Sequence, residues 1–315
     1  MPRTRTGSSS LPDRGKSRRG PPHVPRNAAE VASALEGLDL GPAKSKGQSF
    51  LTDPFVADAE AALVGTAPGE PVLEVGGGLG ILTQALLRRQ IGPLTVVEKE
   101  PRLAAFLRYH FGDRIRVVEG DALVAPVPPV RVIVGNLPFS IATPLLRRWL
   151  AERVPKIVAL VQKEVGDRLA AGPGSKTYGR FSVLAALYGT FETHQTVSAS
   201  SFYPVPAVDG RLVVFRRRRG SLPVRSVSTL ESLLDTLFAS RRKQLGNLLP
   251  RALARLRDPR PAAVLAARAE WPMEWERLRP ESLGPDDYFR IARLLEGGTA
   301  PAPDSGRTSP LTGGR

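Results

Sequence analysis

The stretch VLEVGGGLGIL, Val72 to Leu82, decides the fold of this chain. It starts as an apolar strand, continues through glycines at 76, 77, 78 and 80, and ends in residues with helical spacing. Glycine lets the backbone turn tightly and lets a ligand approach the N-terminus of the following helix closely. The stretch therefore predicts a strand, a ligand-binding turn and a helix.

Outside this stretch, short apolar segments alternate with helical ones. Residues 53–65 have helical spacing, with Asp53 as the expected N-cap and Pro54 in the first turn. The predicted strands are PVLEVG, LTVVE, IRVVEG, VRVIVGN and KIVALVQKE, and GRLVVFRRRRG closes the series. Strands spaced in this way by helices favour a doubly wound α/β fold, with a parallel sheet covered on both faces. Ligands of such folds bind at the carboxyl ends of the strands.

Composition divides the chain into four segments. Residues 1–43 form a basic extension rich in Arg, Ser, Gly and Pro, for which we predict disorder; an organelle transit peptide is the alternative. The α/β domain covers 44–220. We expect a small all-helical domain over 221–296, because STLESLLDTLFASRRKQLGNLL, RPAAVLAARAEW and GPDDYFRIARLLEG are helical by period. Residues 297–315 resemble a disordered tail.

The charge of the chain favours a polyanionic partner. The net charge is +15, and the flanks carry it: residues 1–46 hold 9 basic and 4 acidic residues, and residues 216–296 hold 17 and 10. Basic regions that hold a phosphate backbone around a nearly neutral catalytic domain would explain this distribution. Solubility alone is the alternative explanation.

Composition also excludes several classes of protein. The chain has no cysteine, which rules out disulfides, thiolate nucleophiles and Cys-ligated metals, and its three histidines lack metal-ligand spacing, so we expect no metal. No stretch approaches 18 consecutive apolar residues, and the Arg-rich N-terminus lacks an apolar core, so no membrane span or secretory signal is indicated. We expect a soluble, cytoplasmic monomer.

The ends of the first three strands suggest a nucleoside-containing ligand. A dinucleotide fingerprint reads G-x-G-x-x-G, whereas Glu74 to Gly80 reads E-x-G-x-G-x-G and resembles the S-adenosylmethionine loop of class I methyltransferases. Glu98 would accept the ribose hydroxyls, and Asp121 would accept from the exocyclic amine of adenine. The alternatives are a structural glycine turn and, for Glu98, an acid that only complements a helix N-terminus.

The fourth strand ends in Asn136, Leu137, Pro138 and Phe139. The exocyclic amine of adenine is a poor nucleophile, so a catalyst must favour the pyramidal nitrogen of the transition state. The Asn136 side-chain oxygen and the Leu137 carbonyl would accept its two N–H groups, Pro138 would fix the turn, and Phe139 would stack on the base. A turn with a core phenylalanine is the alternative.

Several stretches together resemble one family. KSKGQSFL, GNLPFSIATPLL, VQKEVGDRLAAGPGSKTYGR, SFYPVPAVDG and ASRRKQLGNLL are similar to the rRNA adenine N6,N6-dimethyltransferases, and more to their KsgA small-subunit branch than to the Erm large-subunit branch. The resemblance runs from about Lys44 to Glu296. It implies a Rossmann-like class I methyltransferase domain with a small C-terminal helical domain.

The resemblance also implies roles for individual residues. Phe202 would be the second aromatic wall of the target adenine, opposite Phe139. S-adenosyl-L-methionine would be the cofactor, held by Gln48, Phe50, Leu51, Glu74, Gly76, Gly78, Glu98, Lys99, Asp121, Ala122 and Asn136. The chain departs from the family pattern at Ser49, at Lys99, and at Phe139, where the small-subunit branch more often has Tyr.

Basic residues outside the α/β core are candidates for contact with RNA. QKEVGDRLAAGPGSKTYGR predicts a helix followed by a mobile loop that could clamp phosphates, and the runs RRRR and SRRK add further charge. Solvated faces are the alternative. The candidates are Lys176, Arg180, Arg216, Arg217, Arg241, Arg242 and Lys243.

The expected function is methylation of adjacent adenosines near the 3′ end of 16S rRNA, within a precursor of the small ribosomal subunit. Erm-type modification of 23S rRNA would use the same chemistry with a different RNA docking. An RNA-binding assembly or transcription factor without catalysis is a further alternative, but such a protein would have no use for a donor pocket. The sequence leaves the extent of methylation open.

Overall fold

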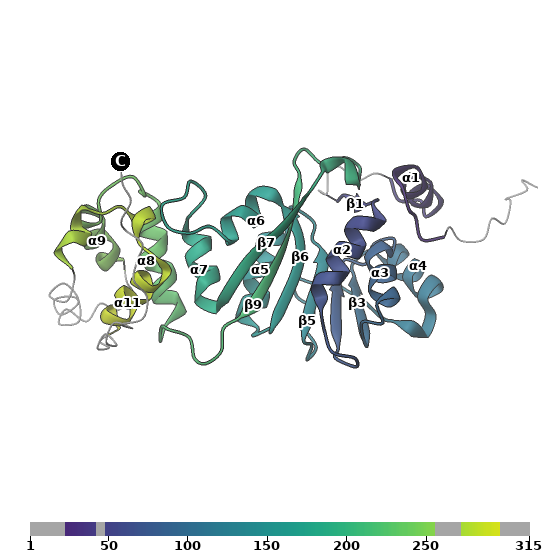
Figure 1. Cartoon of the computed structure of the whole chain (residues 1–315), viewed down its shortest axis with the longest axis horizontal. Coiled ribbons are helices and arrows are strands. Elements are labelled where there is room, and N and C mark those ends of the chain that lie inside the picture. The colour runs from purple at the N-terminus through teal and green to yellow at the C-terminus, as the bar shows by residue number, and fades with distance from the viewer. Residues whose placement is uncertain (1–22, 42–47, 256–271, 297–315) are drawn as a thin grey trace, which may run out of the picture.

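The computed structural model describes residues 23–41, 48–255 and 272–296, and this part of the chain contains a seven-stranded sheet flanked by helices (Figure 1). The strand order is β4-β3-β2-β5-β6-β9-β7. The strands β2 to β6 are parallel, whereas β9 runs antiparallel to β6 and to β7. Their bounds are β2 Val72–Val75, β3 Leu94–Glu98, β4 Arg116–Glu119, β5 Val132–Asn136, β6 Lys156–Gln162, β7 Gly189–Val197 and β9 Gly210–Arg217.

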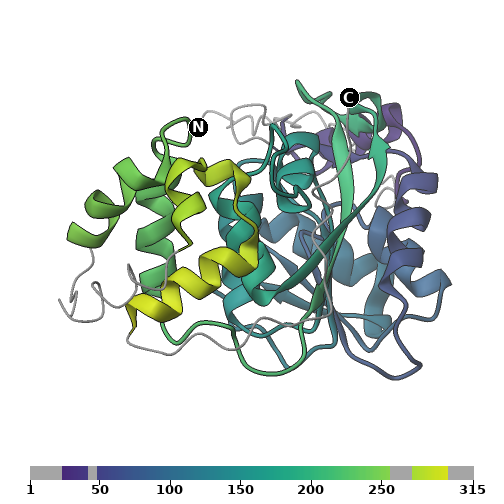
Figure 2. The same ribbon diagram turned by 60° about the vertical axis from the view of Figure 1, so that its left-hand side comes forward.

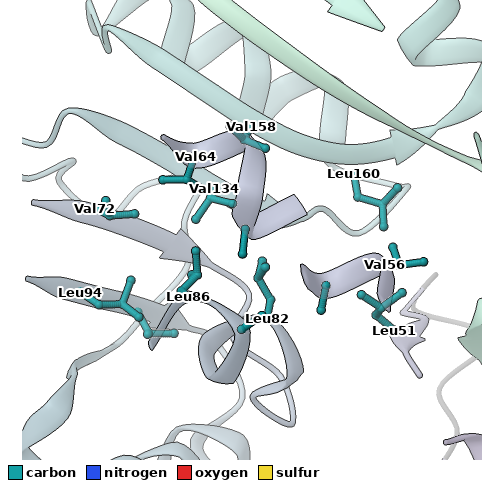
Figure 3. Close-up of a cluster of buried hydrophobic side chains, with 14 of the residues drawn as sticks. Leu51, Val56, Val64, Val72, Leu82, Leu86, Leu94, Val134, Val158 and Leu160 are labelled. Atoms are coloured by element: carbon teal, nitrogen blue, oxygen red, sulfur yellow. The ribbon is translucent and has the colours of Figure 1, made fainter. Parts of the chain in front are cut away.

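Helices cover the sheet on both faces, as the alternating pattern predicts. One face packs against α2 (Pro54–Val64), α3 (Ile81–Arg88) and α4 (Pro101–Phe111). The other packs against α5 (Ala142–Ala151), α6 (Lys163–Leu169) and α7 (Arg180–Tyr188). Figure 3 shows the core of the first face, where side chains of α2 and α3 meet those of four parallel strands. The doubly wound α/β fold is thus confirmed.

Local sequence explains how α2 is placed. The Asp53 carboxylate accepts from the Phe55 N–H at 2.9 Å, and Pro54 occupies the first turn, where no N–H is required. The buried residues of α2, which are Val56, Ala57, Glu60, Ala61 and Val64, form one stripe that faces the sheet. Just before α2, strand β1 (Phe50–Leu51) pairs with β8 (Phe202–Tyr203) in a separate two-stranded ribbon.

The C-terminal helices form a second core with α7. The helices α8 (Val227–Phe238), α9 (Leu245–Ala254) and α11 (Pro285–Leu295) pack together at the end of the molecule opposite α3 and α4 (Figures 1 and 2). Three short 3₁₀ turns lie at Gly112–Arg114, Met273–Arg277 and Pro280–Ser282, and a fourth at Ala199–Ser201 precedes β8. Tyr178 joins the sheet domain to this core, because its buried hydroxyl donates to the Leu283 carbonyl at 2.9 Å.

The structure differs from the sequence-based expectation in four places. Helix α1 (Ala28–Gly37), capped by Asn27, lies within the extension predicted to be disordered. Strand β7 was not predicted. The helix expected over 228–249 is divided into α8 and α9 by a turn at 239–244. The loop at 172–178 packs against the helical core. The RPAAVLAARAEW helix, most of the extension and the C-terminal tail lie outside the described residues.

Among the described residues, no helix combines the length and the apolar character that crossing a bilayer requires.

Candidate active site

A cavity of about 530 Å³ lies at the carboxyl ends of β2, β3, β4 and β5. A volume of this size is typical of small-molecule cofactor sites. Ten of the eleven predicted cofactor residues line it, as does Pro138 of the predicted catalytic turn; the ten are Gln48, Phe50, Leu51, Gly76, Gly78, Glu98, Lys99, Asp121, Ala122 and Asn136. The sequence did not single out other lining residues, among them Leu79, Glu100, Leu103, Ser140 and Ile141.

The glycine loop after β2 brings bare backbone to the cavity wall. Gly76 and Gly78 have φ of +77° and +53°, in the region that residues with a Cβ rarely adopt. A Cβ at Gly77 would stand 2.5 Å from Cγ1 of Val96. The loop therefore needs glycine for both conformation and space, and it presents main-chain atoms to a ligand.

Glu98 connects two loops at the base of the cavity. Its carboxylate accepts from the Gly78 N–H and from the Glu100 N–H, both at 2.9 Å. Burial raises the pKa of Glu98, and the two amides oppose that shift. These bonds hold the carboxylate in one orientation at the end of β3, where its remaining lone pairs can accept from a ligand.

Asp121 is held ionised at the rim of the same cavity. Lys99 Nζ donates to Asp121 Oδ2 at 2.8 Å, and the Leu123 N–H donates to Oδ1 at 2.9 Å. The bond from Lys99, followed by that from Leu123, lowers the pKa of this carboxyl. Lys99, which departs from the family pattern, thus holds the predicted adenine acceptor in place.

Glu74 does not line the cavity and lies beneath the glycine loop. It is almost fully buried, and its Oε2 accepts from the Thr83 hydroxyl at 2.8 Å, which ties β2 to α3. Burial raises the pKa of Glu74 to about 8, with Glu98 adding to the shift and Thr83 opposing it. The expected ligand contact is therefore replaced by a structural contact between strand and helix.

Glu60 of α2, which no sequence pattern singles out, faces Glu74 across this core. It is fully buried, and burial followed by repulsion from Glu74 raises the pKa of Glu60 well above its usual range. The amide of Gly135 opposes the shift, but neither carboxyl oxygen has a partner within hydrogen-bond geometry among the described residues. Two buried carboxyl groups with raised pKa thus lie behind the cavity.

Asn136 ends β5 at the cavity wall, whereas the next residue, Leu137, is buried and does not line the cavity. The Leu137 N–H donates to the Leu160 carbonyl at 3.0 Å, and the Ile141 N–H donates to the Pro138 carbonyl at 3.0 Å, which closes the turn. Within the described part of the chain, no group hydrogen-bonds the Asn136 side chain or the Leu137 carbonyl oxygen. The turn therefore offers two acceptors for an amine.

Phe139 and Phe202 meet, but not as two parallel walls. Their ring centroids lie 6.2 Å apart with planes at 64°, and Phe202 is only 1% exposed. A base cannot enter between rings that touch edge to face. Phe139 is half-buried and keeps a ring face for stacking, whereas Phe202 supports it from the core.

Helix α1 is attached to the cavity rim by Arg102, another residue that the sequence did not single out. Its guanidinium donates to the carbonyls of Asp39, at 2.5 Å, and Leu38, at 3.3 Å, and its Nε pairs with Glu100 at 3.1 Å. A smaller hollow of about 130 Å³, lined in part by Gln48 and Phe50, lies beside this contact. Leu35, Leu40 and Gly41 line this smaller hollow together with Gln48 and Phe50, so the region of α1 lies next to the cavity rim.

Two neighbouring arginines of the RRRR run have different environments. Arg217 donates to the carbonyls of Val154, at 2.8 Å, and Leu150, at 2.6 Å, near the end of α5. Arg217 therefore ties the end of β9 to the end of α5. The signal in the sequence is that neighbouring residues of a strand point to opposite faces, so Arg216 and Arg217 differ in environment. Arg216 is exposed, and its Nε lies 3.9 Å from the exposed carboxylate of Glu192.

The loop predicted to clamp phosphates is anchored instead to the helical core. The Gly174 N–H donates to the Glu281 carbonyl at 2.7 Å, and Arg180 pairs with Asp235 of α8 at 2.5 Å. Arg241 donates to the Lys176 carbonyl at 3.3 Å, so the structure brings these two basic residues together. Lys176, Arg241, Arg242 and Lys243 are exposed.

Comparisons with known proteins agree with this geometry. The fold is similar to the crystal structure of a dimethyladenosine transferase from Plasmodium falciparum, with a TM-score of 0.69 at 22% identity. The match covers 79% of this chain and 98% of that one. The 23S rRNA methyltransferase ErmE matches with a TM-score of 0.57 at 26% identity, and covers 78% and 99%. The fold and the strand-end cavity define a class I methyltransferase.

Sequence relatives narrow the class to a family. The family model described as ribosomal RNA adenine dimethylase matches residues 43–258. Proteins named ribosomal RNA small subunit methyltransferase A are 38% identical in Leifsonia xyli, over 84% of this chain and 96% of that protein, and 37% identical in Kineococcus radiotolerans, over 88% and 93%. The chain belongs to the ribosomal RNA adenine dimethylase family, as its motifs predict.

Proposed function

We propose that this protein transfers methyl groups from S-adenosylmethionine to N6 of adjacent adenosines near the 3′ end of 16S rRNA, giving dimethyladenosine. The observation that carries the proposal is the turn after β5, where Asn136 Oδ1 at the cavity wall and the carbonyl of the next residue, Leu137, have no partner among the described residues. The relatives named small subunit methyltransferase A support the choice of RNA.

The cavity fits the proposed methyl donor. Asp121 at the rim offers a carboxylate to an adenine amine, and Glu98 offers one to ribose hydroxyls. Gly78 has no side chain, so a ligand can lie directly on the backbone of the glycine loop. A Cβ at this position would stand 3.4 Å from the Phe50 ring and would take up space at the cavity wall. When bound, S-adenosylmethionine supplies an electrophilic methyl group.

The acceptor turn is suited to an amine whose lone pair is delocalised into a ring. Asn136 and the Leu137 carbonyl would accept the two N–H groups of the target and stabilise the positive charge that develops on N6. Phe139 would hold the base by stacking on one face. The proton leaves for water, since Asn136 is too weak a base to keep it, and positioning supplies most of the rate.

The second methylation limits how the turn can hold the base. A monomethylated amine keeps one N–H, so one of the two acceptors must then suffice. The stack on Phe139 would keep the nitrogen in place while the other acceptor faces a methyl group. We infer that dimethylation depends more strongly on Phe139 than the first transfer does.

The exposed basic residues are proposed to hold the RNA. The exposed candidates lie at the end of β9 and on the helical core. They are Arg216, Lys176, Arg241, Arg242 and Lys243. Contacts of this kind position a phosphate backbone and weaken with rising salt. Location in the cytoplasm and action as a monomer stay predictions from composition.

The test is to incubate the purified full chain with labelled S-adenosylmethionine and with unmethylated small and large ribosomal subunits. We expect dimethyladenosine at neighbouring positions near the 3′ end of the small-subunit RNA, located by primer extension. Label confined to the large-subunit RNA would support the Erm-type alternative, for which the ErmE match gives some ground. Binding of RNA without transfer would support the non-catalytic alternative.

A further inference from the structure

Phe55 is a large aromatic side chain placed in solvent without a structural task. It is the first residue after Pro54 in α2 and is 84% exposed, whereas the next residue, Val56, is buried in the core. Exposing a phenylalanine ring in water is unfavourable, because the ring gives up the burial that an apolar side chain gains elsewhere. Single apolar residues are common on protein surfaces, so the position of Phe55 relative to the active site decides whether it suits a contact with a partner.

The fold places Phe55 at the edge of the sheet that carries the active site. Lys156, the first residue of β6, donates from Nζ to the Val64 carbonyl at 2.7 Å, so the C-terminal end of α2 lies at the amino ends of the parallel strands. The N-terminal end of α2 is about 16 Å away, from a rise of 1.5 Å per residue. In Figure 3, Leu51 and Val56 accordingly lie on the side of Leu160, near the carboxyl end of β6.

A chain of contacts connects Phe55 to the aromatic pair of the acceptor site. Asp53, which accepts from the Phe55 N–H, also accepts from the Ser201 hydroxyl at 3.5 Å. The Thr52 N–H donates to the Ser201 carbonyl at 2.8 Å. Phe202 follows directly, and its ring contacts Phe139. The base of Phe55 is thus held beside the turn that receives the target adenine.

The neighbouring loop extends this apolar edge. Val205 and Val208, which follow β8, are 61% and 45% exposed. Together with Phe55 they leave apolar side chains around a site whose substrate is a polyanion. The chain carries a net charge of +15, but these three residues carry none, so they suit the bases of the RNA rather than its phosphates.

We propose that Phe55 stacks on an unpaired base of the RNA next to the adenosine in the acceptor site. The inference rests on the proposed function, since it needs a flipped adenosine whose neighbours are single-stranded. Stacking there would fix the register of the RNA, so that one adenosine enters the turn while its neighbour lies on Phe55. Phe55 is a positioning residue in this role and does not touch the reacting atoms.

The test measures RNA affinity while Phe55 and the flanking base of the RNA are changed separately and together. A short synthetic RNA that contains the mapped adenosines is compared with versions that lack one flanking base, and each is bound to the wild-type chain and to Phe55→Ala at fixed salt. We expect Phe55→Ala to weaken binding of the intact RNA by about 5- to 150-fold, the range for one base–aromatic stack. The loss should nearly vanish on the RNA that lacks the stacked base. Phe55→Trp should restore affinity.

Matched controls separate this role from general effects. Met273→Ala removes an equally exposed apolar side chain, 84%, from the helical end, and Tyr109→Ala removes an exposed aromatic from α4; neither should change RNA binding. An effect of Phe55→Ala that is the same on every RNA, or no effect at all in an enzyme that methylates rRNA normally, would overturn the inference. If the wild-type chain methylates no RNA, the proposed function itself fails.

Discussion

Glu74→Gln should make the protein less sensitive to alkaline pH. Burial raises the pKa of Glu74 from 4.5 to about 8, so between these values the folded state keeps a proton that the unfolded state releases. The free energy of unfolding therefore falls as pH rises, by about 1.4 kcal/mol per pH unit from this group. Stability from this group is fully present below pH 4.5 and is lost by pH 8.

The glutamine variant keeps an acceptor for the Thr83 hydroxyl and removes the ionisation. Relative to wild type, it should gain about 2 to 3 kcal/mol between pH 6 and pH 8. The gain corresponds to about 1 M in the urea midpoint. Urea unfolding followed by tryptophan fluorescence measures it, since Trp149 and Trp275 are buried reporters of the two cores.

An exposed acid provides the control for this prediction. Glu36→Gln changes the same charge on the surface of α1 and should alter neither the midpoint nor its pH dependence. If Glu74→Gln is destabilised equally at pH 6 and pH 8, the carboxyl is charged in the folded protein. The picture of a protonated acid behind the donor cavity would then be wrong.

Three further substitutions test other parts of the structure. Gly78→Val should weaken binding of S-adenosylmethionine at least about tenfold in calorimetry, because φ of +53° strains a β-branched residue and its side chain would enter the cavity. Tyr178→Phe should lower the free energy of unfolding by about 1 kcal/mol, since the Leu283 carbonyl loses its donor; an unchanged urea midpoint would argue against that bond. Arg217→Ala should lower it by about 2 kcal/mol, whereas Arg216→Ala should leave stability unchanged and reduce the salt dependence of RNA binding by about one phosphate contact.

The sheet could be predicted because the central parallel strands β2, β3, β5 and β6 are buried on both faces. Strands such as β2 are apolar at every position but one, and they stand out between helical segments. Strand β7 escaped prediction because most of its residues are exposed, so Gly189–Val197 has no apolar run. Helix α1 escaped because the arginines and prolines around it dominate the composition of the extension, although AAEVASALEG buries Val31, Ala34 and Leu35.

The sequence predicts which strand ends carry the site residues, but it does not predict how deeply each side chain is buried. The residues that end β3 and β5 and those that directly follow β4 line the cavity, because the carboxyl ends of parallel strands meet at one edge. Glu74 lies two residues before the glycine loop that follows β2. Because side chains alternate between the two faces of a strand, its carboxyl points into the core beneath the loop and not into the cavity. The burial of Phe202 and the carbonyl partners of Arg217 depend on packing between distant segments, which no local pattern records.

Single-turnover methyl transfer by Asn136→Ala is the most direct test of the central claim, that the turn after β5 activates the adenine amine. With saturating S-adenosylmethionine and unmethylated small subunits, the rate should fall by about 100-fold or more. The affinities for donor and RNA should remain close to those of wild type. A rate equal to that of wild type would show that Asn136 does not activate the amine.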